Sequence, residues 1–155
     1  MTRINLVPPS ELSDQHLFAE WREIKMVPKA LRRSLRALLQ LSHRPEEILL
    51  DKLPKEFTLG TGHVMFFYDK GHYLHDRYAR LTYELIKRGI KCNLQSRPDV
   101  DGVFADLGAA FNRNYTPTPE ALTLIRIRIA EKIAMKPSWY RWSATSESTP
   151  LRSAA

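Results

Sequence analysis

The sequence predicts an all-α fold, a compact single domain of about three main helices with long irregular connections. Three observations predict this class. Apolar residues recur at helical spacing within residues 11–25 and again within residues 69–89, and the run Thr118-Pro119-Glu120 has the composition of a helix start. A chain of 155 residues with 43% hydrophobic residues is also long enough to bury one ordinary globular core.

The first main helix is predicted to run from about Glu11 to Lys25. Two prolines break the extended RINLV segment before it, and Ser10 is a candidate N-cap whose hydroxyl can accept a free backbone N–H. Pro28 is expected to stop or kink this helix. The inward-facing stripe is predicted to contain Leu17, Phe18, Trp21 and Ile24.

A second helical piece is predicted over residues 29–41. Three leucines fall on one stripe, and Arg32, Arg33 and Arg36 fall on the other side. This basic side could contact phosphates or could be an ordinary solvated helix face, and the residues favour neither. The following segment, 42–62, contains prolines and glycines and is predicted to be a loop with a short helix around 46–50.

The next main helix is predicted to begin near Asp69, a candidate N-cap, and to end at Gly89. The aromatic run before it, residues 66–68, is expected to fill the core. The buried stripe of this helix is predicted to be Leu74, Tyr78, Leu81 and Leu85. Residues 91–116 are predicted to form loops with a short helix between about 103 and 111.

The last main helix is predicted to start after Thr118 and to end at about Met135. Its expected buried stripe is Leu122, Ile125, Ile129 and Ile133. Arg128, Lys132 and Lys136 recur at i, i+4 and i+8 on another face, a spacing that can neutralise successive phosphates. The domain is predicted to span residues 1–142, followed by a disordered tail at 143–155. The aromatic residues just before that tail could pack on the core or stack on a base.

Charge points to the partner. The net charge of +7 favours an anionic partner, nucleic acid first. A single cysteine, Cys92, excludes an internal disulfide, and no window has the apolar length of a membrane span or a secretory signal. We therefore expect a soluble, cytoplasmic monomer.

The amino end has one chemical property that lysines lack. Removal of Met1 before a residue as small as Thr2 would expose an α-amine, whose pKa of about 7.8 leaves much of it neutral near pH 7.5. A neutral amine can form a Schiff base, and Glu23, on the same helical face as His16 and Glu20, could supply the carboxylate such chemistry needs. From spacing alone, an ordinary terminus beside a solvated helix face is the more common explanation.

Four stretches change that balance: MTRINLV, SELSDQHLFAEWREI, GHVMFFYDK and EKIAMKPSWYRW, in this order. Together they resemble the pyrimidine-dimer DNA glycosylases, the family of phage endonuclease V and its viral and bacterial relatives. The resemblance covers residues 1–26 and 57–90 closely and 117–142 more loosely, whereas 29–56 and 91–116 match poorly. It implies a DNA glycosylase that is also an abasic-site lyase, acting on duplex DNA with cyclobutane pyrimidine dimers and needing no metal or cofactor.

The resemblance also implies roles for individual residues. Thr2 would supply the attacking amine, and Glu23 would stabilise the imine and assist β-elimination. The residues expected to contact DNA or line the pocket are Arg3, Gln15, His16, Arg22, Lys25, Arg128, Lys132 and Lys136. The phage member has an arginine where this chain has Met26, and Lys25 lacks the planar fork needed to replace it fully.

Two other functions remain open. A non-catalytic basic DNA-binding module would explain the charge but would leave Thr2 and Glu23 without a role. A metal-dependent nuclease or hydrolase could use His72, His75 and Asp76, although two histidines beside a carboxylate are common on solvated helices.

Overall fold

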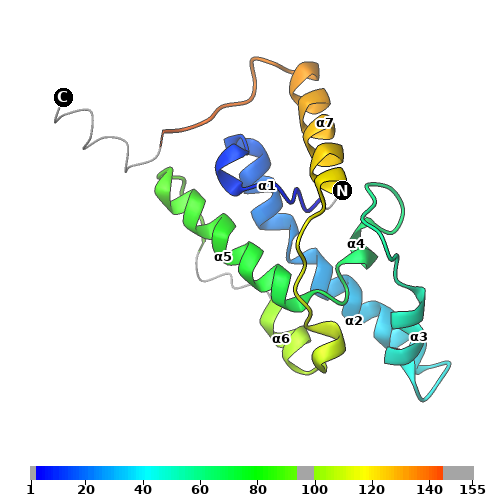
Figure 1. Ribbon diagram of the computed structural model, residues 1–155. Coiled ribbons are helices and arrows are strands. Elements are labelled where there is room, and N and C mark those ends of the chain that lie inside the picture. The colour runs from blue at the N-terminus through cyan, green and yellow to red at the C-terminus, as the bar shows by residue number, and fades with distance from the viewer. Residues whose placement is uncertain (1–2, 94–99, 145–155) are drawn as a thin grey trace.

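The computed structural model describes residues 3–93 and 100–144, and over this range the chain is all-α, as predicted (Figure 1). The elements are η1 (Pro9–Glu11), α1 (Asp14–Glu23), α2 (Met26–Leu39), α3 (Pro45–Lys52), α4 (His63–Phe66), α5 (Gly71–Lys87), α6 (Val100–Ala105), η2 (Ala109–Phe111) and α7 (Pro119–Met135). In the described ranges no helix combines the length and the apolarity needed to cross a membrane.

The first helix begins later than predicted. Ser10 lies in the short 3₁₀ turn η1 and is exposed, so the prediction that it caps the helix is wrong. The cap is Ser13, which has extended backbone angles and whose hydroxyl accepts the His16 N–H at 3.1 Å. Three members of the predicted inward stripe, Leu17, Trp21 and Ile24, are buried, and Phe18 is half-buried against the core.

Pro28 neither stops nor kinks a continuous helix. α1 ends at Glu23 and α2 begins at Met26, so Pro28 lies in the first turn of α2. The N–H groups of a first turn have no intrahelical acceptor, and a residue without an N–H therefore costs nothing there. The two helices follow one another along the molecule in Figure 1.

The central helix is α5. Its N-cap position is Lys70, not Asp69, whose carboxylate instead pairs with the Lys70 ammonium at 2.8 Å. At the other end, Gly89 has a left-handed φ of 72°, which places the Ile90 N–H on the Leu85 carbonyl at 3.0 Å. This ending is the glycine stop that the sequence predicts.

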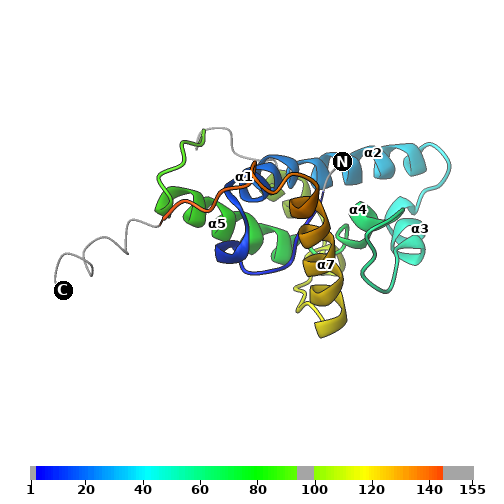
Figure 2. The same cartoon turned by 90° about the horizontal axis from the view of Figure 1, so that it is seen from above.

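Helices α5 and α2 each pack against several other elements. α1 packs along α5, and α2 lies beside α3 and α4 (Figure 2). α2 also contacts α6. The core contains the predicted leucines of α5 together with the aromatic residues 66–68. The same face of α5 also buries Arg77, Glu84 and Arg88, which the apolar pattern does not predict.

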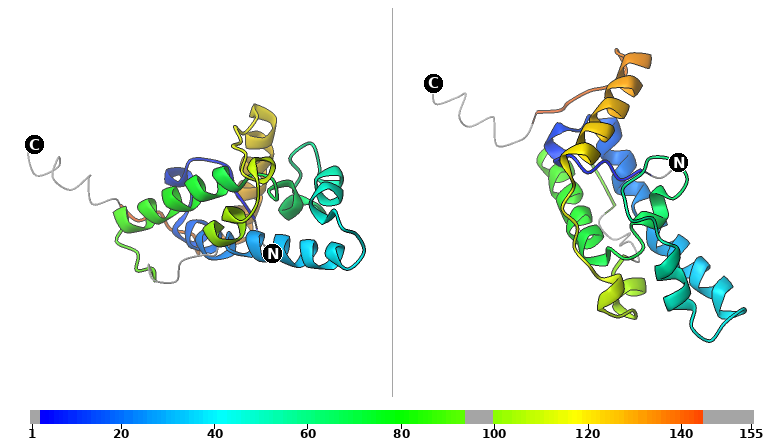
Figure 3. Two further views of the ribbon diagram at one scale, coloured as in Figure 1. Left: turned by 90° about the horizontal axis from the view of Figure 1, so that it is seen from below. Right: turned by 45° about the vertical axis from the view of Figure 1, so that its right-hand side comes forward.

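The last helix, α7, begins and ends where predicted. The Thr118 hydroxyl accepts the Ala121 N–H at 3.1 Å, and the helix runs to Met135. The predicted buried stripe is only partly right, because Ile125 and Ala121 are buried whereas Leu122, Ile129 and Ile133 are half-buried. The reason is that α7 stands out from the other helices, as both views in Figure 3 show.

The connections contain more helix than predicted. α3 extends the expected 46–50 helix to eight residues. The expected helix at 103–111 is two short pieces, α6 and η2, joined by a turn in which the Asn112 amide donates to the carbonyls of Phe104, Leu107 and Gly108.

Candidate functional site

A cavity of about 160 Å³ lies where the N-terminal segment, α1 and α7 meet. The segment consists of residues 3–7, which are extended or irregular and mostly buried. The cavity is lined by Arg3, Asn5, His16, Ala19, Glu20, Glu23, Arg128, Ile129 and Lys132. Five of the residues that the sequence singles out are thereby brought together, from both ends of the chain.

Buried polar groups fix the N-terminal segment to the helices behind it. Glu20 is 1% exposed and accepts the Asn5 N–H at 3.0 Å. The Arg77 guanidinium donates to both Glu20 oxygens, at 2.7 and 3.0 Å, and to the Val7 carbonyl at 2.6 Å. Glu20 therefore holds the segment and is no solvated helix residue. Glu23, one turn further on, is half-buried and faces the cavity.

A third buried group, His63, holds the segment from α4. Its Nε2 lies 2.9 Å from the Ile4 nitrogen, and its Nδ1 lies 2.8 Å from the Thr58 carbonyl oxygen. A carbonyl only accepts hydrogen bonds, so Nδ1 carries the proton and Nε2 accepts the Ile4 N–H. Burial lowers the pKa of His63, which keeps this ring neutral near pH 7.

The cavity is predominantly positive. Arg3, Arg128 and Lys132 stand against Glu23, while the charge of Glu20 is balanced by Arg77. Burial and then the neighbouring Arg128 lower the pKa of Arg3, and Glu23 acts in the opposite direction. This excess of positive charge favours an anionic ligand in the cavity.

His16 is held at the cavity edge by two contacts. Its Nδ1 is 3.0 Å from the Ser13 hydroxyl, and its ring stacks on Tyr140 with centroids 4.7 Å apart. Burial, followed by Arg128, lowers its pKa. His16 is therefore a neutral polar group in the wall at physiological pH.

Two predicted phosphate ligands lie outside the cavity lining. Arg22 is exposed, with its guanidinium 5.9 Å from the centre of the Phe18 ring. The Lys25 ammonium lies 4.5 Å from the centre of the Trp21 ring, and burial followed by Lys29 and Arg22 lowers its pKa. These cations form a separate edge on the last turn of α1 and the residues just after it.

Gln15 is placed differently from the prediction. It does not line the cavity, since its amide donates to the Trp139 carbonyl at 2.6 Å and accepts the Arg141 N–H at 3.0 Å. Lys136 is also outside the cavity, at the end of α7, where it is exposed and lies 5.8 Å from the centre of the Trp139 ring. Both residues belong to the region where the C-terminal segment crosses α1.

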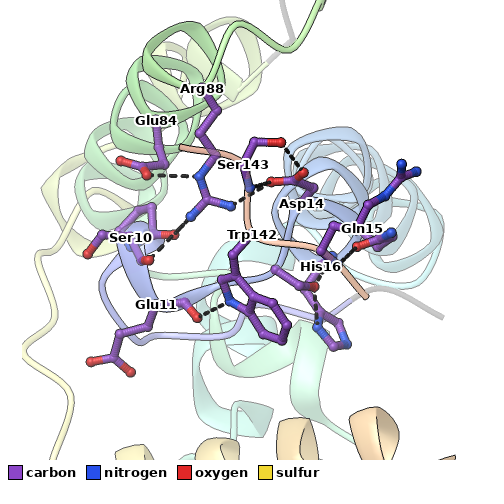
Figure 4. Close-up of polar contacts among 12 residues, drawn as sticks. Ser10, Glu11, Asp14, Gln15, His16, Glu84, Arg88, Trp142 and Ser143 are labelled. Carbon is purple, nitrogen blue, oxygen red and sulfur yellow. Dashed lines mark hydrogen bonds and ion pairs between the residues drawn. The ribbon is translucent and has the colours of Figure 1, made fainter. Parts of the chain in front are cut away.

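That C-terminal segment, residues 137–144, is bound to the start of α1 (Figure 4). Ser143 donates to Asp14 from its backbone and from its hydroxyl, and the Trp142 indole N–H donates to the Glu11 carbonyl at 3.2 Å. Ser143 is the first residue of the predicted tail, which spans residues 143–155. Residues 145–155 lie outside the described residues, so the disordered tail stays a prediction.

Arg88, which the sequence did not single out, connects η1 and the start of α1 to α5. Its guanidinium contacts Asp14 and Glu84, each at 3.0 Å, and the carbonyls of Pro9 and Ser10 (Figure 4). Burial opposes the charge of Asp14, but hydrogen bonds from Ser143 and Arg88 outweigh it and lower the pKa. The available signal was the spacing, because positions 77, 84 and 88 follow the apolar stripe of α5.

The Thr2 amine remains to be placed, as does the alternative of a metal site at His72, His75 and Asp76. Thr2 lies outside the described residues, and its neighbour Arg3 lines the cavity. His72 lies 3.3 Å from Asp76 on an exposed face of α5. In the part of the chain that the structure describes, no group of three or more His, Cys, Asp or Glu side chains could hold a metal ion.

An all-α protein with a basic cavity, Glu23 facing into it and an N-terminal segment running along it has the features of a protein that handles an anionic substrate. The sequence model of one family, the pyrimidine dimer DNA glycosylases, matches residues 1–97, and the chain belongs to this family. The family indicates a DNA repair glycosylase and implies a DNA substrate that contains pyrimidine dimers.

Proposed function

We propose that this protein cuts DNA at pyrimidine dimers in two steps, as a glycosylase and then as an abasic-site lyase, by way of an imine on the Thr2 amine. The observation that carries the proposal is that Arg3, the residue after Thr2, lines the same cavity as Glu23. Only Arg3 separates Thr2 from the anchored Ile4, and two residues of extended chain span at most about 7 Å.

In the first step, the neutral amine of Thr2 attacks the anomeric carbon of the sugar that carries the 5′ base of the dimer. The nitrogen–carbon bond forms as the glycosidic bond breaks, and the base leaves with the bonding electrons. The bond between that carbon and the ring oxygen then breaks, the ring oxygen takes up a proton from the nitrogen, and an iminium cation forms between the nitrogen and the carbon. Glu23 lines the cavity, whereas the charge of the other lining carboxylate, Glu20, is balanced by Arg77. Electrostatic stabilisation of this cation is the first role proposed for Glu23.

In the second step, a proton leaves the adjacent sugar carbon and the bond to the 3′ oxygen breaks. Glu23 accepts that proton, and the 3′ phosphate departs with the electron pair. Hydrolysis of the imine then returns the free amine. The cations Arg3, Arg128 and Lys132 are proposed to hold the phosphates that flank the sugar, because all three line the cavity.

Arg22 and Lys25 are proposed to contact a more distant part of the backbone. They lie outside the cavity lining, and each is supported by an aromatic ring of α1. A lesion that weakens base stacking lowers the free energy needed to bend the duplex, so that it can contact both the cavity and the edge formed by Arg22 and Lys25.

The test compares Glu23→Gln with Glu131→Gln, which removes the same charge from an exposed position of α7. Glu23→Gln should bind dimer-containing duplex like the wild type but cut it far more slowly, whereas Glu131→Gln should cut normally. Wild-type cleavage by Glu23→Gln would remove this residue from the mechanism.

The amine is tested separately. Borohydride should trap a covalent protein–DNA adduct only when mass spectrometry shows Thr2 as the first residue, and retained Met1 or acetylated Thr2 should abolish it. Side-by-side assays on dimer-containing and abasic duplexes in excess chelator would separate the two activities. Binding without cleavage of either duplex would favour the non-catalytic module.

A further inference from the structure

The backbone of the N-terminal segment is strained and held in place. Leu6 has a positive φ of 57°, and the Val7 N–H reaches back to the Asn5 carbonyl at 2.5 Å, which describes a γ-turn of the rare strained kind. Such a conformation costs on the order of 1–3 kcal/mol and persists only where the surroundings enforce it. The residues on either side of Leu6 are held by hydrogen bonds, Asn5 by Glu20 and Val7 by Arg77.

His63 provides the anchor nearest to Thr2. It contacts Ile4, whereas Glu20 and Arg77 contact the residues that follow. The ring is 1% exposed and is packed edge-on by Phe57 and Phe67, with centroids 5.4 and 5.5 Å away. No second orientation is consistent with the hydrogen bonds, because only Nδ1–H can donate to Thr58 while Nε2 accepts from Ile4.

We propose that His63 is a positioning residue for the N-terminal amine, and that a proton on its Nε2 releases the segment from the cavity. The proposal rests on the proposed function, in which that amine is the nucleophile. A protonated ring would place two N–H donors, Nε2 and the Ile4 amide, against each other. The segment can then move, and the amine loses its position relative to Glu23.

The charges around His63 determine how readily that proton binds. Arg3 on the N-terminal segment and Arg128 on α7 oppose protonation, as burial does. The Thr58 carbonyl and Glu20 on α1 favour it. Glu20 is already engaged with Arg77 and Asn5, so it offers little to a second cation.

The experiment uses two substitutions at position 63. His63→Leu removes both hydrogen bonds, whereas His63→Gln keeps a neutral oxygen that can accept the Ile4 N–H at every pH. Asn112→Ala is the control, since it removes three hydrogen bonds to backbone carbonyls in the turn after α6, away from the cavity.

The first readout is the single-turnover rate of adduct formation with saturating enzyme. His63→Leu should lower this rate by about ten- to a hundredfold, as expected for a misplaced reacting group, and leave duplex affinity unchanged. His63→Gln should restore most of the rate. On the acidic side of the pH profile, His63→Gln should lower the slope of log rate against pH by about one. The reason is that the proton that binds Nε2 of His63 no longer affects the rate. Asn112→Ala should match the wild type in both respects.

The second readout needs no catalysis and keeps the two proposals apart. Hydrogen exchange of the Ile4 amide should be slow in the wild type and in His63→Gln at neutral pH. In the wild type alone, the protection factor of this amide, its intrinsic exchange rate divided by its observed rate, should fall as the His63 ring protonates, which is followed through the nitrogen chemical shifts of the ring. Slow exchange without any trapped adduct would overturn the proposed function and leave the anchor intact. The positioning role would be overturned if folded His63→Leu formed the adduct at the wild-type rate. It would also be overturned if exchange of the Ile4 amide did not change as His63 titrates.

Discussion

The Arg77 guanidinium and the Glu20 carboxylate form a two-pronged ion pair, at 2.7 and 3.0 Å, with both side chains almost fully buried. The pair joins α5 to α1 beneath the N-terminal segment, and each partner also binds that segment. The pair therefore serves to position the N-terminal segment as much as to stabilise the fold, because the free energy needed to desolvate a buried ion pair offsets much of its attraction.

Breaking this pair from one side should be costly. Arg77→Met should lower the free energy of unfolding by about 3–5 kcal/mol, because Glu20 would stay buried without its cation. Urea unfolding measures the change. Arg80→Met, at an exposed position of the same helix, is the control and should change it little. Adding Glu20→Gln to Arg77→Met should recover part of the loss, and a further loss would show that the charge of Glu20 is compensated elsewhere.

Acid should destabilise the protein through the buried His63. The pKa of His63 is lowered in the folded state, so below about pH 6.5 the unfolded chain binds more protons and the free energy of unfolding falls. Above that pH the contribution is complete. His63→Gln should flatten the decline below about pH 6.5 by up to about 1.4 kcal/mol per pH unit. An equal decline in His63→Gln and in the exposed control His72→Gln would contradict this assignment.

Salt dependence should distinguish two arginines on α7. Arg128 lines the cavity, whereas Arg126 faces outward and forms a double hydrogen bond with Glu11, at 2.9 and 3.1 Å. Arg128→Ala should weaken binding to every duplex and reduce the slope of log affinity against log salt by about one. Arg126→Ala should leave that slope unchanged. The same slope in both variants would mean that Arg128 meets no phosphate.

Two glycines should respond to alanine in opposite directions. A Cβ on Gly71 would lie 2.6 Å from atoms of Phe104 and Asn112, so Gly71→Ala should cost about 1–3 kcal/mol by forcing α6 away from α5. A Cβ on Gly108 meets nothing within 4 Å, and its backbone is extended. Gly108→Ala should be neutral or stabilise the fold by up to about 1 kcal/mol, because the unfolded chain loses freedom. Thermal unfolding of both variants checks the contrast.

Local signals in the sequence predict the helices well and their beginnings less well. Thr118 followed by proline and glutamate predicts a helix that begins at Pro119, and α7 begins there. Ser10 and Ser13 are equally good caps on paper, and the choice is made by η1, whose 3₁₀ hydrogen bonds end at Leu12. The sequence pattern does not show that a new helix starts at Met26. Pro28 therefore looks like the end of the first helix, although it lies in the first turn of the second.

The candidate site is harder to predict because its parts are distant in the sequence. The resemblance pointed to Arg3, His16 and Glu23, and the cavity contains all three. Arg77 and His63 were missed, since nothing in periodicity says that a charged or titratable residue on a helix is satisfied by a distant backbone group. Gln15 was expected in the pocket, but its amide binds the C-terminal segment, which sequence patterns alone do not place.

The cavity has one wall from α1 and another from α7, and this arrangement sets an order of events during synthesis. Roughly a hundred residues separate Glu23 from Arg128, which a ribosome adds in about 5–20 s. A nascent chain therefore carries the carboxylate long before it has the cations opposite. The cavity described above is therefore complete only after α7 has been synthesised and has packed against the N-terminal segment and α1.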